Sequence, residues 1–254
     1  MPTPCSDRTR FADQAVVILG GNAGIGLAAA RLFAGEGARL ALTGRNAATL
    51  AEAAAETGAL GLVADMGDVA ATTAAVQQIG AALGPIDVLF LNAGVGGFAP
   101  VADVSQPFWD GIHDVNLRGA FFALQAAIAL MRDGGAIVVT GSIGSIAAVP
   151  GNVAYAAAKA GLRAVVRIVA KELLPRRIRV NMVSPGPTET EIFKRDASEA
   201  QIAAMRDMLA GIVPIGRMGE ADEVARAALF LASHEASFIN GVDLYVDGGC
   251  IELG

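Results

Sequence analysis

One tyrosine and one lysine stand four residues apart in GNVAYAAAKAGL, residues 151–162, a segment otherwise rich in alanine and glycine. If this segment is helical, Tyr155 and Lys159 lie on one face, about one turn apart. A free phenol has a pKa of about 10, and a nearby ammonium favours the phenolate and lowers that pKa. Such a phenol could protonate a ketone that accepts hydride, or deprotonate an alcohol that gives it up. The spacing alone predicts only neighbours, and a packing tyrosine beside a solvated lysine is the competing interpretation.

A serine hydroxyl is available to the same chemistry. Ser142 lies thirteen residues before Tyr155, just beyond the strand-like run AIVVT. Negative charge develops on a carbonyl oxygen as it accepts hydride, and a positioned hydroxyl dipole stabilises that charge. Ser145 is a nearby competitor for this role.

A glycine-rich turn, G-G-N-A-G-I-G at residues 20–26, directly follows the first apolar run and opens a predicted helix. Glycines let the backbone turn sharply and approach a pyrophosphate, which then lies at the helix N-terminus. The turn therefore predicts a dinucleotide site, with an ordinary tight turn as the alternative. The residues assigned to this site are Gly20, Asn22, Ala23, Gly24, Ile25 and Gly26.

The end of the second predicted strand, T-G-R-N at residues 43–46, bears on which dinucleotide binds. Selection of NAD uses an acidic side chain at this point to bind the ribose hydroxyls. Gly44 has no side chain, and the guanidinium of Arg45 suits a phosphate monoester. The pattern favours NADP(H) over NAD(H), while a surface arginine in a loop is the alternative.

Strand-like and helical segments alternate along the whole chain. Apolar runs occupy residues 15–19, 40–43, 60–64, 87–91, 136–140, 178–183 and 242–246. Helical patterns occupy 24–35, 107–131, 152–173, 198–211 and 220–232, and two more begin near 47 and 68. This alternation predicts an α/β, doubly wound (Rossmann-type) fold: a mostly parallel seven-stranded sheet with helices on both faces. Ligands bind such sheets at the carboxyl ends of the strands, where glycine and polar residues gather in this sequence.

We expect residues 1–12 to be a flexible lead-in and residues 13–254 to form a single catalytic domain, with a substrate lid around 188–215. The chain has 254 residues, 54% of them hydrophobic, and a net charge of −6, which argues against nucleic-acid binding. No apolar run approaches the roughly 18 to 20 residues of a membrane span, so we expect no membrane partner. The two cysteines, Cys5 and Cys250, are interpreted as incidental thiols of a cytoplasmic protein. No metal-ligand spacing occurs, and no metal is predicted.

In order and spacing, these motifs resemble the short-chain dehydrogenase/reductase family, in its short form with a Y-x-x-x-K motif. The matches run through nearly the whole chain: the glycine turn, N92-A-G, Asn116, Ser142, Tyr155, Lys159, P185-G and the R217-M-G…D247-G-G tail. One departure is Leu19, because the family usually has threonine before the first glycine. That threonine is mainly structural, and we expect little loss of cofactor binding.

The resemblance implies roles for individual residues. Asn116, Ser142, Tyr155 and Lys159 form the family's catalytic set, in which Asn116 holds a proton-relay water. Tyr155 and Lys159 also bind the cofactor, Lys159 through the nicotinamide ribose. For Asn116 alone, a helix kink or cap is the competing explanation. The other implied cofactor contacts are Asp65 and Met66 at the adenine, Asn92, Ala93 and Gly94 beside the adenosine, and Pro185, Gly186, Thr188 and Thr190 across the nicotinamide. The second basic residue common in the family's NADP enzymes would fall at Ala23 and is absent, which weakens the preference for NADP(H).

The surroundings of the catalytic set predict the substrate class. The candidate pocket residues are Val95, Ile143, Val149, Phe193 and Met205, all apolar. They favour an uncharged, hydrophobic ketone or secondary alcohol, although ordinary packing of the helix at 198–211 explains its apolar residues equally well. An alternative is a 3-oxoacyl-[acyl-carrier-protein] reductase, which would need a basic patch from Arg118, Arg163 and Arg167. A cofactor sensor that binds NADP(H) without turnover is a third possibility, but it would not need the complete catalytic set.

Small residues suggest how copies of the chain could meet. Ala154, Ala157, Ala158 and Gly161 would let another helix approach the segment 152–173 closely. The family pairs this helix across a two-fold axis, so the resemblance implies a homotetramer. Burial of the same residues within one subunit is the alternative.

Overall fold

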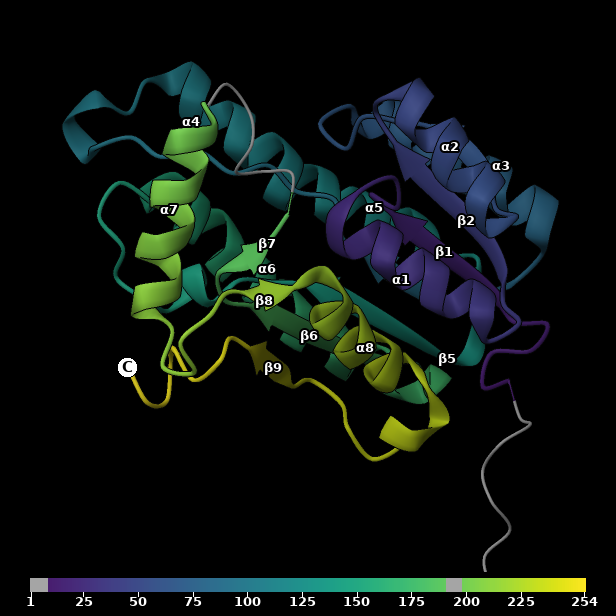
Figure 1. Ribbon diagram of the computed structural model, residues 1–254. Helices are drawn as coiled ribbons and strands as arrows, with labels where there is room; N and C mark the ends of the chain where they lie inside the picture. Colours follow the sequence, from purple (N-terminus) through teal and green to yellow (C-terminus); the bar gives the residue numbers. More distant parts are fainter. Residues whose placement is uncertain (1–8, 191–197) are drawn as a thin grey trace, which may run out of the picture.

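The computed structural model describes residues 9–190 and 198–254 and contains one seven-stranded sheet (Figure 1). The strands are β1 (Ala15–Leu19), β2 (Arg39–Gly44), β3 (Leu60–Val63), β4 (Ile86–Leu91), β5 (Met131–Thr140), β6 (Arg179–Pro185) and β9 (Asp243–Val246). Their order is β3-β2-β1-β4-β5-β6-β9, and every neighbouring pair is parallel. The predicted doubly wound fold is confirmed, and its strand order reverses between β1 and β4, where such sheets bind ligands.

Helices cover both faces of this sheet. One face carries α3 (Val69–Leu83), α5 (Ala120–Ile128) and α6 (Val153–Glu172), and the other carries α1 (Gly24–Gly35), α2 (Ala47–Thr57) and α8 (Ala221–Ala232). Alternate strand residues enter opposite cores: Val17 and Leu19 pack on the first side, Val16 and Ile18 on the second. Because successive strand side chains point to opposite faces, a strand covered on both sides is apolar throughout. This is why the inner strands contain long apolar runs such as AVVIL in β1 and AIVVT in β5.

The helix predicted at 107–131 is interrupted and ends earlier. It consists of α4 (Gln106–His113), a π-helical segment (Asp114–Gly119) and α5, and Met131 already pairs with Ile86 of β4. A Cβ on Gly119 would overlap the carbonyl oxygen of Met66, so this turn lies directly against the loop after β3. Isolated π turns are frequent at functional sites, and this one carries Asn116.

The predicted lead-in is wrong for its last residues. Phe11 is 1% exposed and packs edge-on against Phe33 of α1, with 4.7 Å between ring centroids. Arg10 forms an ion pair with Glu36, and the Phe11 N–H donates to the Glu36 carbonyl. Residues 1–8, including Cys5, lie outside the described residues.

Smaller elements complete the carboxyl edge of the sheet. After β6, a two-residue strand β7 (Thr188–Glu189) pairs in parallel with β8 (Gly219–Glu220), and between them comes α7 (Glu199–Ile212). In Figure 1, α7 stands at the end of the molecule where β6 leads into β7. Within residues 9–190 and 198–254, the remaining single-turn helices are Val101–Asp103, Ile143–Ser145, Leu174–Arg176 and His234–Ala236.

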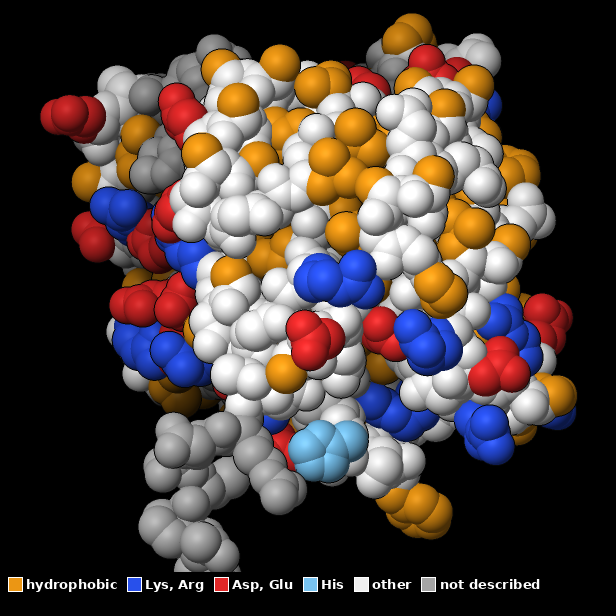
Figure 2. All heavy atoms as spheres, turned by 90° about the vertical axis from the view of Figure 1, so that its right-hand side faces the viewer, with side chains coloured by type: hydrophobic (Ala, Val, Ile, Leu, Met, Phe, Trp, Pro, Cys, Tyr) orange, Lys and Arg blue, Asp and Glu red, His pale blue; other side chains and the backbone are white. Residues whose placement is uncertain are grey.

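Acidic and basic side chains are mixed on the surface of the molecule. On the face in Figure 2, acidic and basic side chains lie interspersed rather than in a patch of one sign. Within the described ranges, no helix combines the length and hydrophobicity that a membrane span requires. The same ranges hold no group of three His, Cys, Asp or Glu side chains placed to bind a metal ion.

Candidate active site

The glycine turn is packed against the loop after β4. Gly20 has a φ of +86°, and a Cβ there would lie 2.7 Å from the Ala93 Cα. A Cβ on Gly26 would overlap the carbonyl oxygen of Gly20. Only glycine adopts this conformation and this approach without strain, so the sequence motif is required by the local backbone.

The N-terminus of α1 fits a phosphate. Its N-cap is Ala23, and no described side chain caps it or places an acid in the first turn. By contrast, Asn46 caps α2 and Asp68 caps α3 through side-chain oxygens. The first N–H groups of a helix need partners, and a phosphate meets that need. The residues present therefore fit the dinucleotide that the sequence predicts.

A chain of hydrogen bonds connects this turn to the lysine. Asn92 Nδ2 donates to the Gly20 carbonyl at 2.9 Å, and Thr140 Oγ1 donates to Asn92 Oδ1 at 2.9 Å. Lys159 Nζ donates to the Thr140 carbonyl at 2.8 Å. Thr140 was not among the predicted site residues, although it is the polar last residue of the run AIVVT at the ligand-binding edge. That position is the signal that could have found it.

Lys159 lies on α6 with its ammonium in the interior. It is 3% exposed, and burial lowers its pKa from 10.5 to about 8. Its Nζ lies 5.7 Å from the centre of the Tyr155 ring. The helical spacing predicted from the sequence is confirmed, and the solvated lysine considered as the alternative is wrong.

Tyr155 and Ser142 meet through a side-chain hydrogen bond. Burial raises the pKa of the Tyr155 phenol, and the bond with Ser142 lowers it by less. The expected net lowering is therefore wrong for the protein without bound ligands, because desolvation outweighs the hydrogen bond with Ser142. The Ser145 hydroxyl donates to the Ser142 carbonyl at 2.8 Å, so the hydroxyl that reaches Tyr155 is that of Ser142.

Asn116 is completely buried, and its side chain is satisfied by backbone groups. Its Nδ2 donates to the carbonyls of Val95 at 2.8 Å and Ile112 at 2.9 Å, and its Oδ1 accepts from the Val95 N–H at 3.2 Å. A Cβ on Gly94 would lie 2.9 Å from Asn116 Oδ1 and 3.6 Å from Lys159 Nζ. Asn116 thus fixes the loop after β4 beside the lysine.

The adenosine end of the predicted site presents an exposed arginine beside a strand end without an acidic side chain. A Cβ on Gly44 would lie 2.5 Å from Asn22 Oδ1, and Asn22 is itself held by a hydrogen bond to Thr49. Arg45 is exposed and forms no ion pair with any described residue. Asp65 is also exposed, and its Oδ1 accepts from the Gly67 N–H. Met66 is buried beneath this loop.

The segment after β6 returns toward the glycine turn. A Cβ on Gly186 would lie 2.7 Å from the Asp247 Cα, and Thr188 donates to the Gly186 carbonyl at 2.9 Å. Thr190 Cγ2 lies 3.4 Å from where a Gly24 Cβ would be. Pro185 ends β6. The predicted nicotinamide-crossing segment and the glycine turn therefore face one another.

The residues predicted to contact substrate lie on several different segments of the chain. Val95 packs against the buried cluster around Ile112, together with Tyr155. Ile143 begins the turn after Ser142, and Val149 is 47% exposed. Met205 lies on α7, and Phe193 lies outside the described residues.

Two loops form the described rim of this site. The Ala99 N–H donates to the Gly151 carbonyl at 2.9 Å, which ties the loop after β4 to the loop before α6. Phe98 is 67% exposed on the first loop and Val149 lies on the second. The sequence pattern did not single out Phe98, because an isolated aromatic residue in a loop carries no periodic signal.

The basic patch needed for an acyl carrier is largely neutralised. Arg118 pairs with Asp114 at 3.1 Å, and Arg163 pairs with Asp243 at 3.1 Å. Arg167 is exposed without a described ion-pair partner.

The small residues of α6 pack within the subunit. Ala154 and Ala158 are buried against Ile112, and a Cβ on Gly161 would lie 3.1 Å from Leu117 Cδ2. They let α4 and the π segment approach α6 inside one chain, so their assignment to a partner helix is wrong. Ala157 is the exposed member of the set.

Comparisons with known proteins agree with this geometry. A family model described as Enoyl-(Acyl carrier protein) reductase matches residues 20–250. The chain is 37% identical over 247 residues to D-threitol dehydrogenase of Mycolicibacterium smegmatis, covering 94% of each chain. It is also 37% identical to cyclopentanol dehydrogenase of a Comamonas species, covering 94% of this chain and 98% of that one. A short chain dehydrogenase from Burkholderia cenocepacia, solved in complex with NADP, superposes with a TM-score of 0.87 at 33% identity, over 95% of this chain and 99% of that one.

Proposed function

The chain belongs to the short-chain dehydrogenase/reductase family and is an alcohol dehydrogenase of that family; from this premise we propose that it interconverts an uncharged, hydrophobic ketone and its secondary alcohol with NADP(H). The observation that supports this most is the buried ammonium of Lys159, held by Thr140 beside the Tyr155 phenol and beside Gly94. An isolated buried ammonium is costly, and a proton-transfer site explains why it is there.

Tyr155 is the proposed general acid and base. In reduction its hydroxyl gives a proton to the carbonyl oxygen, while the Ser142 hydroxyl hydrogen-bonds the same oxygen and stabilises its developing charge. The resulting phenolate is stabilised by the Lys159 ammonium one turn away. In oxidation the phenolate takes the alcohol proton. The nicotinamide, when bound, supplies or accepts the hydride.

Lys159 has a second proposed role, because its Nζ lies next to Gly94 as well as Tyr155. It binds the nicotinamide ribose and returns a proton to Tyr155 through a water near Asn116. The Asn116 side chain is already bonded to Val95 and Ile112. Its contribution to the relay is therefore to hold the loop after β4 at the correct distance from Lys159.

NADP(H) is proposed over NAD(H) because Arg45 is exposed and unpaired among the described residues, beside a strand end that lacks an acid. The Asn22 side chain fills the space where an acidic residue at position 44 would begin. The uncapped N-terminus of α1 binds the pyrophosphate, and the segment Pro185–Thr190 covers the nicotinamide.

Replacing Arg45 with alanine tests the cofactor proposal. An arginine paired with a phosphate contributes about 1.5–3 kcal/mol, so the KM for NADPH should rise at least ten-fold and that for NADH by less than two-fold. The measurement is initial-rate reduction of small and bulky ketones with each cofactor. Equal losses for both cofactors would remove the phosphate role from Arg45.

The alternatives are less well supported. The description of the matching family model favours an acyl-carrier substrate, but Arg118 and Arg163 are already paired with acids. A cofactor sensor would not require a buried lysine beside a partly buried phenol. Turnover of ketones, but not of an acyl thioester on its carrier, is the result that our proposal expects.

Three further properties belong to the same proposal. We expect a homotetramer, a single catalytic domain that includes Arg10 and Phe11 and has its lid around 188–215, and a cytoplasmic location. The exposed aromatic residues Trp109, Phe121 and Phe122 support an assembly that covers α4 and α5.

A further inference from the structure

The helix α7 is attached to the rest of the subunit by few buried contacts. None of its described side chains is buried, and Met208 and Ile212 are 60% and 61% exposed. None of its residues belongs to the three clusters of buried hydrophobic residues. Elements with little buried apolar area open locally at low cost. The remaining contacts of α7 therefore decide how firmly it is held.

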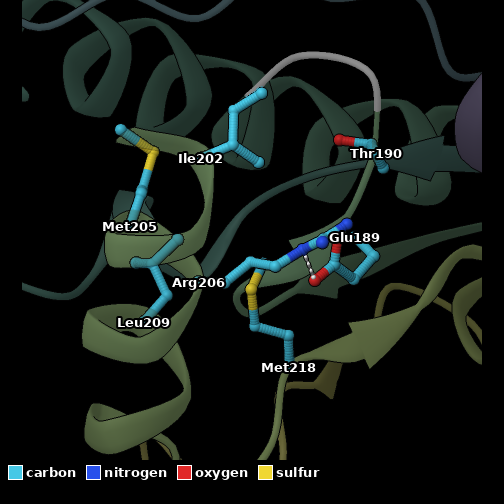
Figure 3. A pocket seen from close by; sticks show the side chains of 7 residues that line it. All are labelled: Glu189, Thr190, Ile202, Met205, Arg206, Leu209 and Met218. Carbon is cyan, nitrogen blue, oxygen red and sulfur yellow. Dashed lines mark hydrogen bonds and ion pairs between the residues drawn. The ribbon is translucent and has the colours of Figure 1, made fainter. Parts of the chain in front are cut away.

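One of the remaining contacts of α7 is made by apolar side chains. Ile202, Met205 and Leu209 lie three and four residues apart on one side of α7 and line a hollow with Met218 and Thr190. Figure 3 shows these side chains around the hollow. Met205 remains 38% exposed. The hydrophobic contribution to holding α7 is therefore incomplete.

An ion pair crosses the same hollow. Arg206 extends from α7 to Glu189 of β7, as Figure 3 shows. The contact is bidentate: Arg206 Nε donates to Oε1 at 2.6 Å, and a terminal nitrogen donates to Oε2 at 2.9 Å. The pair raises the pKa of Arg206, chiefly through the hydrogen bond to Glu189. Bidentate geometry makes this one of the stronger types of ion pair.

The position of Glu189 connects this pair to the site. Glu189 stands between Thr188 and Thr190, the two residues proposed to contact the nicotinamide, and its strand β7 pairs with β8. Thr190 also reaches the glycine turn at Gly24. The ion pair to Glu189 therefore constrains the segment that covers the cofactor.

We propose that Arg206 and Glu189 are positioning residues: their ion pair is a latch that holds α7 over the substrate side of the site and fixes the segment Thr188–Thr190. Because α7 buries so little, a pair of this kind is a large part of what holds it. The effect of the latch on substrate binding rests on the proposed function. The ion pair itself is present in the chain without ligands.

The matched control is a second exposed bidentate pair. Arg31 of α1 binds Glu56 of α2 at 2.5 Å and 3.0 Å, with side chains 53% and 47% exposed, against 50% and 38% for Arg206 and Glu189. It lies on helices of the other end of the sheet and does not touch α7. Glu189→Gln and Arg206→Gln break the latch, and Arg31→Gln breaks the control pair.

Hydrogen exchange of residues 199–212 in the full-length protein without ligands tests the latch. Because exposed ion pairs stabilise only modestly, exchange in α7 should accelerate roughly two- to five-fold in Glu189→Gln and Arg206→Gln. It should stay at the wild-type rate in Arg31→Gln. Salt should accelerate exchange in the wild type and not in Glu189→Gln, because screening weakens the pair. The charge-reversed double variant Glu189→Arg/Arg206→Glu should restore slow exchange.

Kinetics tests the consequence for the site. In Arg206→Gln, which lies on α7 outside the cofactor segment, the KM for a ketone should rise by a similar two- to five-fold while kcat is retained, since the reacting groups are untouched. Wild-type exchange in both latch variants, or equal acceleration in Arg31→Gln, would overturn the latch. If no ketone is turned over at all, the proposed function fails while the exchange result still decides whether the latch exists.

Discussion

At the scale of single residues, Lys159 is the residue whose burial most affects the charge state of the site. Its ammonium is buried, bonded to one backbone carbonyl and close to a phenol whose own pKa burial raises. Both groups are therefore biased toward their neutral forms before any ligand binds. Negative charge from a bound cofactor or a reacting oxygen would reverse that bias for Lys159.

The lowered pKa of Lys159 predicts a pH-dependent stability. Between pH 8 and 10.5 the unfolded chain keeps the proton that the folded chain has lost, so unfolding takes up a proton and stability rises with pH. Relative to Lys159→Met, the wild type should gain up to about 3 kcal/mol of unfolding free energy between about pH 7.5 and 10, most of it above pH 8. Urea denaturation at several pH values measures this. Lys171→Met, which removes a charge at the exposed far end of α6, is the control. A difference between wild type and Lys159→Met that stays constant with pH would contradict the burial of the charge.

The sequence identified residues better than it identified their energetics. The spacing of Tyr155 and Lys159 follows from helical geometry and could be predicted. The role of Thr140 depends on which backbone carbonyl meets the lysine, which no local pattern encodes. The direction of the Tyr155 pKa depends on how completely the fold excludes water, and this is a property of the tertiary structure.

At the scale of elements, the π segment shows what the sequence could not specify. The inner strands were predictable because burial on both faces makes most of their residues apolar, whereas the edge strands β3 and β9 are only partly buried. The break at residues 114–119 arises from contact with the loop after β3, and its residues D-V-N-L-R-G show no helix-breaking proline. The strands β7 and β8 have two residues each and are too short for a periodic signal.

Two glycines in this helical stretch should respond oppositely to alanine. A Cβ on Gly119 would overlap the Met66 carbonyl, so Gly119→Ala should destabilise the protein by about 1–3 kcal/mol. A Cβ on Gly111 of α4 would meet nothing within 4 Å, so Gly111→Ala should stabilise it by about 0.5–1 kcal/mol. Thermal and urea denaturation compare the two. Equal effects of both substitutions would mean that the π segment is not held against the loop after β3.

At the scale of the whole molecule, most of the small residues of α6 allow close helix packing within one subunit. Ala154 and Ala158 are buried against α4 within one subunit. The sequence could not distinguish this packing from a contact between subunits, because the distinction depends on where α4 and α6 lie. What remains for an assembly is the exposed side of the same helices, including Ala157 and the aromatic residues of α4 and α5.

The proposed tetramer predicts an asymmetry between two exposed alanines. Ala157 is exposed on α6, so arginine there is tolerated within the subunit but would obstruct a neighbouring helix. Sedimentation should give four chains for the wild type and fewer for Ala157→Arg. Ala55→Arg, at an exposed position on α2, should remain tetrameric. A monomeric wild type would contradict the proposed assembly.

We propose that Tyr155 transfers the proton in an NADP(H)-dependent carbonyl reaction. The most direct measurement compares wild type and Tyr155→Phe for NADPH-dependent ketone reduction and, in parallel, for NADPH binding by fluorescence. Loss of general acid catalysis costs at least about 10²–10⁴-fold in rate. We expect a loss of that size in kcat, with NADPH binding within about two-fold of wild type because the glycine turn and Lys159 remain. Retained ketone reduction in Tyr155→Phe would contradict it.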